Sequence, residues 1–352
     1  MRRYGTSVLV ILCAISCSAP LISVTGSVTT QPAGGELRLH FIDVGQGDCV
    51  LVEFPGGSTM LVDCGSSKNG DPLAVRRYLE KALDGRKKIE TVVITHPDTD
   101  HYNMIPEVLK GLQVGQVYAS GSSKEYTEDF RDWLEDQKAG PAGFKVLEED
   151  YNVESPRKLG SFGGVDVRVL ASNVGSATNA RSIVLMVSFK DFDALLMGDA
   201  TTETEADMLE RFEGQRACLD VEVLKVGHHG STTSSGKVWM DRAKPEVSVI
   251  SAADNSQHRH PKDKVLNRLI ACAEAEKLHR MQWWYLQEKK NAMKDIPDCP
   301  KAVYSTATNG TVMVTTDGGE YWVLYKPDKT RDEEIKPAQA KHRLALTRPN
   351  WN

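Results

Sequence analysis

The sequence has few cysteines and little excess of either charge. None of its seven cysteines is spaced as CxxC, which argues against a zinc ribbon. Its 48 Asp and Glu residues outnumber its 43 Lys and Arg residues, giving a formal net charge of −5. This balance argues against a wide electrostatic surface for nucleic acid. A local surface stays open, because four basic residues cluster near a histidine late in the chain: Arg259, Lys262, Lys264 and Arg268.

Long apolar runs are absent after residue 27, so no later segment is expected to cross a membrane. Before it, a short basic start (1–3) and an apolar stretch (8–15) predict an export signal over residues 1–27. An uncleaved anchor is the alternative. Ala14-Ile15-Ser16-Cys17 also resembles a bacterial lipoprotein box, which would lipidate Cys17. We therefore expect an extracytoplasmic protein that is secreted, periplasmic or attached to the surface as a lipoprotein, with a signal or lipid anchor as its membrane attachment.

The rest of the chain predicts one domain with strands and helices in two successive blocks. Residues 28–36 read as a linker, 37–325 as the domain and 326–352 as a polar tail. An insertion is expected at about 277–303, where Trp283, Trp284 and a Lys/Asp-rich run occur. The order of elements suits two packed sheets with helices outside. Strands are predicted at 37–44, 49–54, 59–65, 89–95, 114–119, 165–170, 182–189, 193–197, 221–226, 247–250, 311–316 and 321–325, and helices at 72–83, 106–112, 125–137, 202–212 and 263–276.

Cys49 and Cys64 fall in adjacent predicted strands. Export implies an oxidising compartment, in which these two cysteines would be able to pair. Two buried thiols are the alternative, and the sequence alone leaves both open. No obligatory protein partner is evident from the sequence.

The segment Thr95–His101 carries most of the chemical information. His96, Asp98, Asp100 and His101 lie within six residues, directly after a buried apolar strand. Open α/β sheets place their active sites at such strand ends. Histidine and carboxylate ligands together suit zinc, manganese or iron(II) rather than a thiolate site. A solvated polar turn is the alternative interpretation of this segment taken alone.

Two further loops repeat this pattern of an apolar strand that ends on metal-binding side chains. One ends on Asp199, and the other on His228 and His229. Adjacent histidines point to opposite sides of an extended chain, so one of the pair is expected to be a direct ligand. Three such loops predict one binuclear centre, which needs about six protein ligands. The expected ligands are His96, Asp98, Asp100, His101, Asp199 and one of His228 and His229.

These motifs, in this order, resemble the metallo-β-lactamase-fold hydrolases, and among them the nuclease domain of ComEC-type competence proteins. The resemblance covers about residues 37–325. It rests on Asp43-Val44-Gly45-Gln46-Gly47-Asp48, Leu61-Val62-Asp63-Cys64-Gly65, His96-x-Asp98-x-Asp100-His101, Asn179-x-x-Ser182, Gly198-Asp199-Ala200, His228-His229-Gly230-Ser231, and Asn255 followed by His260-Pro261. Asp98 stands where the usual superfamily cluster has a second histidine, a variant also found in ComEC-like proteins and phosphorylcholine esterases.

The resemblance implies an α/β fold, a four-layer αββα sandwich of two mixed sheets flanked by helices. It implies two divalent ions, Zn²⁺ or Mn²⁺. His96 and Asp98 would bind one ion, and Asp100, His101 and the His228/His229 pair the other, with Asp199 bridging both. Asn179 and Ser182 replace a usual histidine ligand, which puts the occupancy of one site in doubt. Residues expected around the ligands or the substrate are Asp43, Asp63, Asn179, Ser182, Ser231 and Asn255.

The expected function is hydrolysis of phosphodiester bonds, with DNA as the leading substrate and a metal-bridging hydroxide as the nucleophile. Asp100 is counted in the catalytic group, and His260 or Lys225 would protonate the leaving oxygen. A phosphorylcholine or other small phosphodiester esterase is the alternative. It suits the acidic charge, and Trp283-Trp284-Tyr285 would form an aromatic box for a choline-like cation. A non-catalytic surface binding module is the third interpretation.

Overall fold

The computed structural model describes residues 35–139, 144–146, 157–214, 219–253, 259–272, 276–287, 290–325 and 338–340. The predicted signal segment (1–27) and Asn255 lie outside the described residues, as do most of the linker and the tail. Within the described part of the chain, no helix combines the length and apolarity needed to cross a membrane.

The first sheet is mixed, with nine strands among the described residues. Its centre is an antiparallel meander in which β2 pairs with β1 and β3. β3, β4 and β5 then run parallel to one another. The strands, in order across the sheet, are β18 (Ala338–Ala340), β17 (Tyr321–Tyr325), β16 (Val312–Thr316), β1 (Leu37–Phe41), β2 (Cys49–Glu53), β3 (Thr59–Cys64), β4 (Lys88–Ile94), β5 (Gln113–Ala119) and β6 (Phe144–Val146).

The second sheet, with seven described strands, is also mixed. β7 to β10 pair antiparallel, whereas β10, β11, β12 and β15 run parallel. The order is β15 (Val303–Ser305), β12 (Val247–Ile250), β11 (Val223–Lys225), β10 (Phe192–Leu196), β9 (Val184–Phe189), β8 (Val165–Ala171) and β7 (Arg157–Phe162). β13 (Glu276–Gln287) and β14 (Lys290–Lys301) pair only with each other among these elements, so the predicted insertion is a separate hairpin.

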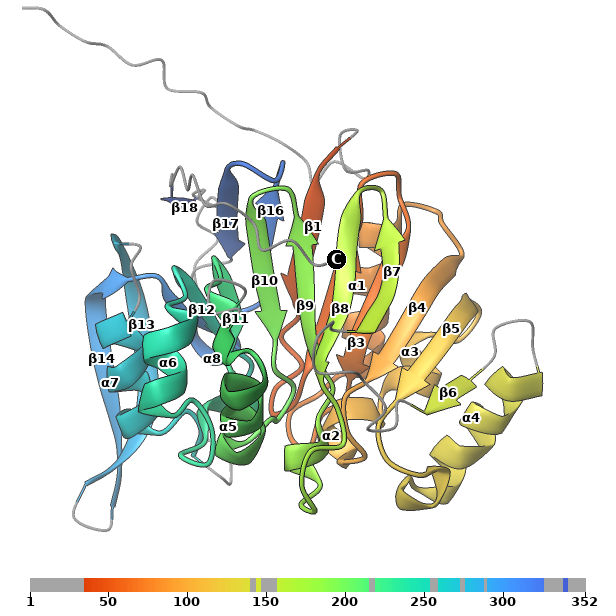
Figure 1. The fold of residues 1–352 in the computed structure, drawn as a ribbon, viewed down its shortest axis with the longest axis horizontal. Coiled ribbons are helices and arrows are strands. Elements are labelled where there is room, and N and C mark those ends of the chain that lie inside the picture. The colour runs from red at the N-terminus through yellow and green to blue at the C-terminus, as the bar shows by residue number, and fades with distance from the viewer. Residues whose placement is uncertain are drawn as a thin grey trace, which may run out of the picture.

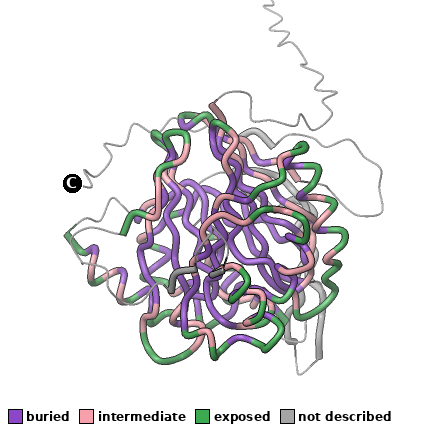
Figure 2. The backbone as a smooth tube through the Cα atoms, turned by 90° about the vertical axis from the view of Figure 1, so that its right-hand side faces the viewer, coloured by how far each residue is buried: buried purple, intermediate pink, exposed green. Residues whose placement is uncertain are grey.

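Apolar side chains form three layers of core. One cluster lies between the sheets and includes Leu39 and Val52 of the first sheet and Val167 and Val187 of the second. The other two clusters lie under the helices on the outer face of each sheet. Every residue of β2 and β3 is buried, as expected of strands covered on both faces. Figure 2 shows this buried interior surrounded by exposed helices and loops.

The helices cover the two outer faces, which confirms two mixed sheets flanked by helices. Figure 1 shows α5, α6 and α7 beside β11 and β12, and α4 near β5 and β6. Asp71 caps the first helix by accepting from the amides of Leu73 and Ala74, with Pro72 at its start. The helices are α1 (Pro72–Leu83), α2 (Thr99–Tyr102), α3 (Ile105–Val108), α4 (Glu128–Ala139), α5 (Thr202–Arg211), α6 (Lys237–Ala243), α7 (Asp263–Cys272) and α8 (Thr306–Asn309).

Some predicted element boundaries were wrong. The helix predicted over 106–112 is the single turn α3, which ends at Val108, and α7 ends at Cys272, while Glu276 already belongs to β13. β6, β7, β15 and α6 were not predicted from the sequence. β15 has three residues, too few for a period-2 pattern, and only its pairing with β12 defines it. Cys49 and Cys64 face each other across β2 and β3 as buried free thiols.

Candidate metal centre

The predicted ligands lie on loops at one edge of the two sheets. His96 follows β4, Asp199 follows β10, and His228 and His229 follow β11. Backbone hydrogen bonds join these loops: the Ile183 amide donates to Thr95 O at 2.9 Å, and the His228 amide donates to Gly198 O at 3.1 Å. The edge predicted from the strand-end pattern therefore exists, and it brings residues far apart in the sequence together.

Asp63, at the end of β3, fixes the first histidine loop. Its carboxylate accepts from the Thr95 amide and hydroxyl, each at 2.7 Å, and from His101 Nδ1 at 2.8 Å. In the neutral form of His101 that binds a metal, Nδ1 donates to Asp63, so Nε2 carries the lone pair and faces the centre. Asp63 thus lies beneath a ligand loop, where the sequence analysis placed it.

The other two rings are oriented in the same sense. His229 Nδ1 donates to the carbonyl of Ser251 at 2.8 Å. His96 Nδ1 lies 3.1 Å from Thr95 Oγ1 and 3.3 Å from Ser182 Oγ. Ser182 Oγ also accepts from the Asp199 amide at 3.1 Å, so it connects two ligand loops. All three histidines therefore present Nε2 to a common space.

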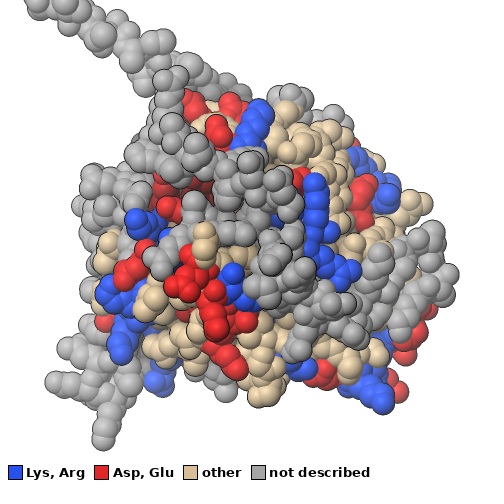
Figure 3. Space-filling view, in the orientation of Figure 1, with Lys and Arg blue, Asp and Glu red and all other residues tan. Residues whose placement is uncertain are grey.

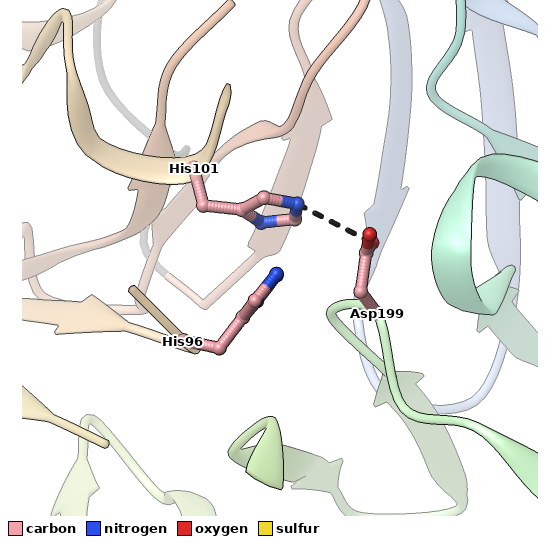
Figure 4. Close-up of side chains that lie close together, drawn as sticks. All are labelled: His96, His101 and Asp199. Atoms are coloured by element: carbon pink, nitrogen blue, oxygen red, sulfur yellow. Dashed lines mark ion pairs between the residues drawn. The ribbon is translucent and has the colours of Figure 1, made fainter. Parts of the chain in front are cut away.

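The atoms that face this space have no hydrogen-bond partner in the described part of the chain. They are the Nε2 atoms of His96, His101 and His229, together with Asp199 Oδ1, and all are buried. Figure 4 shows His96 and His101 directed toward Asp199, with 3.3 Å between His101 Nε2 and Asp199 Oδ1. Buried polar atoms without partners are costly, and a bound cation would satisfy them. These nitrogen and oxygen donors fit divalent metal ions.

The ligand atoms form overlapping groups that share His101, Asp199 and His229. His96, His101 and Asp199 make one group, and Asp100, His101 and His229 another; within each group the ligand atoms lie within 4.8 Å of one another. Asp98 lies beside the first group, with Oδ2 3.5 Å from His96 Nε2 and 45% of its side chain exposed. The structure therefore brings the predicted ligands together, with His101 close to both His96 and Asp100.

The structure distinguishes His228 from His229. Both have positive φ, in a tight turn that sends their side chains apart. His229 is buried, and its Nε2 lies 3.5 Å from Asp199 Oδ2 and 3.6 Å from Asp100 Oδ2. His228 is partly exposed, with Nδ1 2.7 Å from Thr233 Oγ1 and Nε2 3.1 Å from Asn179 Nδ2. The geometry favours His229 as the direct ligand and places His228 at the rim.

Carboxylates dominate the electrostatics of the centre. Burial lowers the pKa of His101, but the carboxylates of Asp199 and Asp63 outweigh burial and hold it well above its ordinary value. Burial raises the pKa of Asp199, but the neighbouring histidines, with His229 foremost, hold it well below its usual range. Such a centre attracts positive charge, which is the property that a metal site needs.

Asp48 is a site residue that the sequence analysis did not include in its ligand set. Its side chain is buried, and Oδ2 forms a 2.6 Å ion pair with Lys225 Nζ. Burial raises the pKa of Asp48, but the positive charge of Lys225 and the neighbouring His229 outweigh it and keep the pKa well below the ordinary value. The Gly45-Gln46-Gly47 turn before it was the available signal: a Cβ at Gly47 would lie 2.2 Å from Gly65 O. Only glycine permits this close approach, which sets Asp48 under the ligand loops.

Lys225 and His260 occupy positions that bear on their predicted role as proton donors. Lys225 is buried, and besides its ion pair it donates to the Val226 carbonyl at 2.9 Å. His260 packs beside His228, with 5.5 Å between ring centroids. Burial, aided by repulsion from His229 and His228, lowers the pKa of His260 to about 3. At neutral pH His260 is therefore in the neutral form, which lacks the proton that a general acid transfers from an imidazolium.

The remaining predicted residues have structural contacts. Asp43 Oδ1 accepts from the Gly45 amide at 3.1 Å, which holds the turn that leads to Asp48. Ser231 Oγ accepts from Thr233 Oγ1 at 3.0 Å, so it supports the residue that contacts His228. Asn179 contacts His228, as described above. Asn255 lies outside the described residues.

Comparison with known proteins places this geometry in a family. The model of the metallo-β-lactamase superfamily matches residues 42–253, more than half of the chain. Relatives are ComE operon protein 3 of Bacillus subtilis (28% identical, covering 66% of this chain and 30% of that protein) and competence protein ComA of Neisseria gonorrhoeae (28%, 71% and 32%). Recombination protein 2 of Haemophilus influenzae is 27% identical, with 66% of this chain and 26% of that protein covered.

The chain therefore spans about a third or less of the length of these curated relatives. Among solved structures, a diphosphatase of the PhnP family matches with a TM-score of 0.36 and 14% identity, over 60% of this chain and 85% of that one. The family match covers the loops that carry His96, Asp199 and His229. The chain belongs to the metallo-β-lactamase superfamily, whose hydrolases are metal-dependent enzymes.

Proposed function

We propose that the chain is a phosphodiesterase that uses two divalent metal ions, with DNA as its leading substrate. The observation that carries the proposal is the convergence of three histidine Nε2 atoms and an Asp199 oxygen, all buried and without hydrogen-bond partners among the described residues. Divalent ions bound there would supply an activated water and neutralise charge on the phosphoryl oxygens. His96, His101 and Asp199 would hold one ion, and Asp100 and His229, with His101 and Asp199 beside them, the other.

The rim of the centre supports a phosphate substrate. The partly exposed ring of His228 is held between Asn179 and Thr233, and the Ser231 hydroxyl supports Thr233. These groups form a fixed set of neutral hydrogen-bonding side chains next to the ligands. We assign them the binding of phosphoryl oxygens, because fixed polar groups stabilise developing charge without reorganising during the reaction.

The relatives support DNA rather than another phosphodiester. Two of their names refer to competence and to recombination, and recombination is a process that acts on DNA. The chain matches a third or less of each of them, so the substrate comes to this chain as a proposal alone. The loop of Arg259 and Lys262 adds positive charge close to the centre. The Lys262 amide donates to the Gly230 carbonyl, and this hydrogen bond holds the loop beside the His228–His229 turn.

A small phosphodiester is the second candidate, and the overall charge favours it. The formal net charge is −5, and on the face in Figure 3 the described Lys and Arg side chains are interspersed with Asp and Glu. A small ester would need only the centre and its rim. The predicted aromatic box at Trp283–Tyr285 cannot contribute to this choice, since the side chains of β13 lie outside the described ones.

The test is hydrolysis by the purified full chain, stripped of metal and then refilled with Mn²⁺ or Zn²⁺. Linear DNA and a chromogenic small phosphodiester are assayed side by side. We expect metal-dependent cleavage of DNA, and its loss in Asp199→Asn, which removes a charged ligand while keeping its size. Asp71→Asn, at the exposed cap of α1, is the matched control and should keep full activity, because Asp71 is not among the ligands and asparagine also caps helices.

The other outcomes of this hydrolysis assay would change the proposed function. Turnover of the small ester alone would replace DNA by the second candidate. No turnover of either substrate, with two ions bound to the wild-type chain, would contradict the phosphodiesterase proposal. The same comparison with Mn²⁺ and Zn²⁺ identifies the metal that supports the reaction, because the nitrogen and oxygen donors accept both.

We also propose that the chain acts outside the cytoplasm, on the strength of its N-terminal segment. Cell fractionation should find it in an extracytoplasmic fraction. Cys17→Ser would release it from membranes if the lipid anchor is used, and would leave its distribution unchanged if the signal is cleaved near residue 27. Retention of the chain in the cytoplasm would contradict this proposal.

A further inference from the structure

Two buried charges lie directly behind the metal ligands and belong to neither histidine loop. Asp48 precedes β2, and Lys225 ends β11 in the other sheet. Asp48 is 2% exposed and Lys225 is 1% exposed, and their side-chain atoms meet at 2.6 Å. Lys225 Nζ is also anchored by the Val226 carbonyl. Such a pair is costly to bury, so its position against the ligands calls for a role beyond stability.

Asp48 reaches the ligand rings without fixing their hydrogen bonds. Its Oδ1 lies 3.5 Å from His229 Nδ1, and its Oδ2 lies 3.9 Å from His101 Nδ1. These two ring nitrogens already donate to Ser251 O and Asp63 respectively. Asp48 Oδ1 has no hydrogen-bond partner in the described part of the chain. The carboxylate is therefore tied on one side by Lys225 and open on the other.

Asp48 is close enough to the centre to act as a ligand itself. Together with Asp199 and His229 it forms a group whose ligand atoms lie within 4.8 Å of one another. What distinguishes it from the other carboxylates is its cation: Lys225 neutralises Asp48, whereas Asp199 faces His101 and His229. Asp48 thus lies close enough to the other ligands to bind a metal ion, but its carboxylate is already paired with the ammonium group of Lys225.

We propose that Lys225 holds Asp48 out of metal coordination, and that this ion pair sets the affinity of the centre for divalent cations. Asp48 and Lys225 are positioning residues, and the inference rests on the metal centre of the proposed function. With both charges in place, the pair is nearly neutral toward an ion. Losing Asp48 leaves a buried ammonium group that repels the ion, and losing Lys225 frees a carboxylate that attracts it.

The test is the affinity for Mn²⁺ alone, measured by titration calorimetry on the metal-free full chain. We expect Asp48→Asn to bind Mn²⁺ about 10- to 100-fold more weakly, the range found for changes to groups that support ligands. Lys225→Met should bind Mn²⁺ about 10-fold more tightly, by the same scale with the opposite sign. The double variant, which leaves no buried charge unpaired, should return to within about threefold of the wild-type affinity.

Two further variants separate this role from a purely structural one. Glu53→Gln removes another buried carboxylate of β2, which pairs with His40 and Arg86. It should lower the melting temperature and leave the Mn²⁺ affinity unchanged. Lys225→Gln keeps a donor for the Val226 carbonyl, and it serves in the event that Lys225→Met does not fold. Circular dichroism establishes that each variant is folded.

The inference requires the Mn²⁺ affinity to change in opposite directions in Asp48→Asn and Lys225→Met. Weaker binding in both Asp48→Asn and Lys225→Met would overturn the inference, because both would then report mere structural damage. Unchanged affinity in both would overturn it as well. A wild-type chain that binds Mn²⁺ but cleaves no phosphodiester would refute the proposed function and leave this inference standing. Cleavage of DNA with unchanged metal affinities in the variants would refute this inference and leave the proposed function standing. A wild-type chain that binds neither Mn²⁺ nor Zn²⁺ would overturn both.

Discussion

At the scale of single residues, the centre depends on groups that fix the ligand rings rather than on the ligands alone. Asp63 accepts three hydrogen bonds, two from Thr95 and one from His101. Ser182 connects the His96 ring to the Asp199 amide, and Ser251 orients His229. Fixed rings lose little freedom when an ion binds, so these supporting groups should contribute directly to metal affinity.

Asp63→Asn tests this support. Asp63 has a φ of 56°, a conformation that asparagine also tolerates, so the backbone should not change. The amide of asparagine cannot accept all three hydrogen bonds. We expect Mn²⁺ affinity to fall about 10- to 100-fold in calorimetry. Unaltered affinity, with Asp71→Asn as the control, would show that Asp63 only closes a turn.

Some residues of the site were predictable from the sequence, and others were not. The cluster from His96 to His101 and the strand-end Asp199 were predicted as one site, because metal-binding side chains after apolar strands carry a local signal. Asp48 was absent from the predicted ligand set because it precedes a strand, whereas the predicted ligands follow the ends of strands. Its reach depends on the approach of Gly47 to Gly65 and on Lys225, which belongs to the other sheet.

At the scale of elements, the loop after His229 is held by one helix. Glu205 of α5 accepts from the amides of Ser235 and Gly236 and from the Ser234 hydroxyl. This contact fixes the segment that begins at the rim residue Ser231. α1 was predicted with its observed bounds, 72–83, because the signals that start and end it are local. The end of α7 and the short β15 depend on pairing, which a local pattern does not contain.

Glu205→Gln tests the loop attachment. The glutamine side chain has one oxygen fewer to accept the two amides, so a buried donor is left unsatisfied. We expect the free energy of unfolding to fall by about 1–3 kcal/mol in chemical denaturation. Limited proteolysis should then cut at 231–236, and the same segment should stay uncut in the wild-type chain. Equal stability and an uncut loop would contradict the assignment.

Glu222, just before β11, should give a pH-dependent stability. Its side chain accepts from the Asp193 amide, and burial raises its pKa to about 8 from an ordinary value of 4.5. The folded chain then binds a proton that the unfolded chain releases above pH 4.5. Stability is therefore full below that pH and falls as the pH rises through about 8. Glu222→Gln keeps the acceptor and should flatten this fall, as denaturation at pH 5 and pH 9 would show. Identical pH slopes in the two proteins would rule the assignment out.

At the scale of the whole molecule, the two sheets act as the scaffold that makes distant loops meet. β4, β10 and β11 end at the same edge of the two sheets, and the core between the sheets fixes the spacing of the loops that follow them. The resemblance stated from the motifs predicted this sandwich, and the structure confirms it. The position of the β13–β14 hairpin was not predictable, since nothing in its sequence says where it packs.

Charge near the site should decide between a polymer and a small substrate. Arg259→Ala and Lys262→Ala are expected to raise the KM for DNA about threefold or more at low salt and to reduce its salt dependence, since each removes one contact with phosphate. The KM for a small phosphodiester should stay the same. Lys110→Ala, which removes an exposed lysine outside this basic cluster, is the matched control. Equal changes for both substrates would assign this loop to the centre itself rather than to a nucleic-acid surface.

The proposed function requires these loops to hold two divalent ions that support the hydrolysis of phosphodiester bonds. The most direct measurement is the rate of DNA cleavage by the metal-free full chain as Mn²⁺ is added in known equivalents. We expect the rate of DNA cleavage to rise with added Mn²⁺ and to reach its plateau at about two ions per chain, the number required by a two-metal site. A chain that binds two ions and still cleaves nothing, or that cleaves fully before any ion is added, would contradict it.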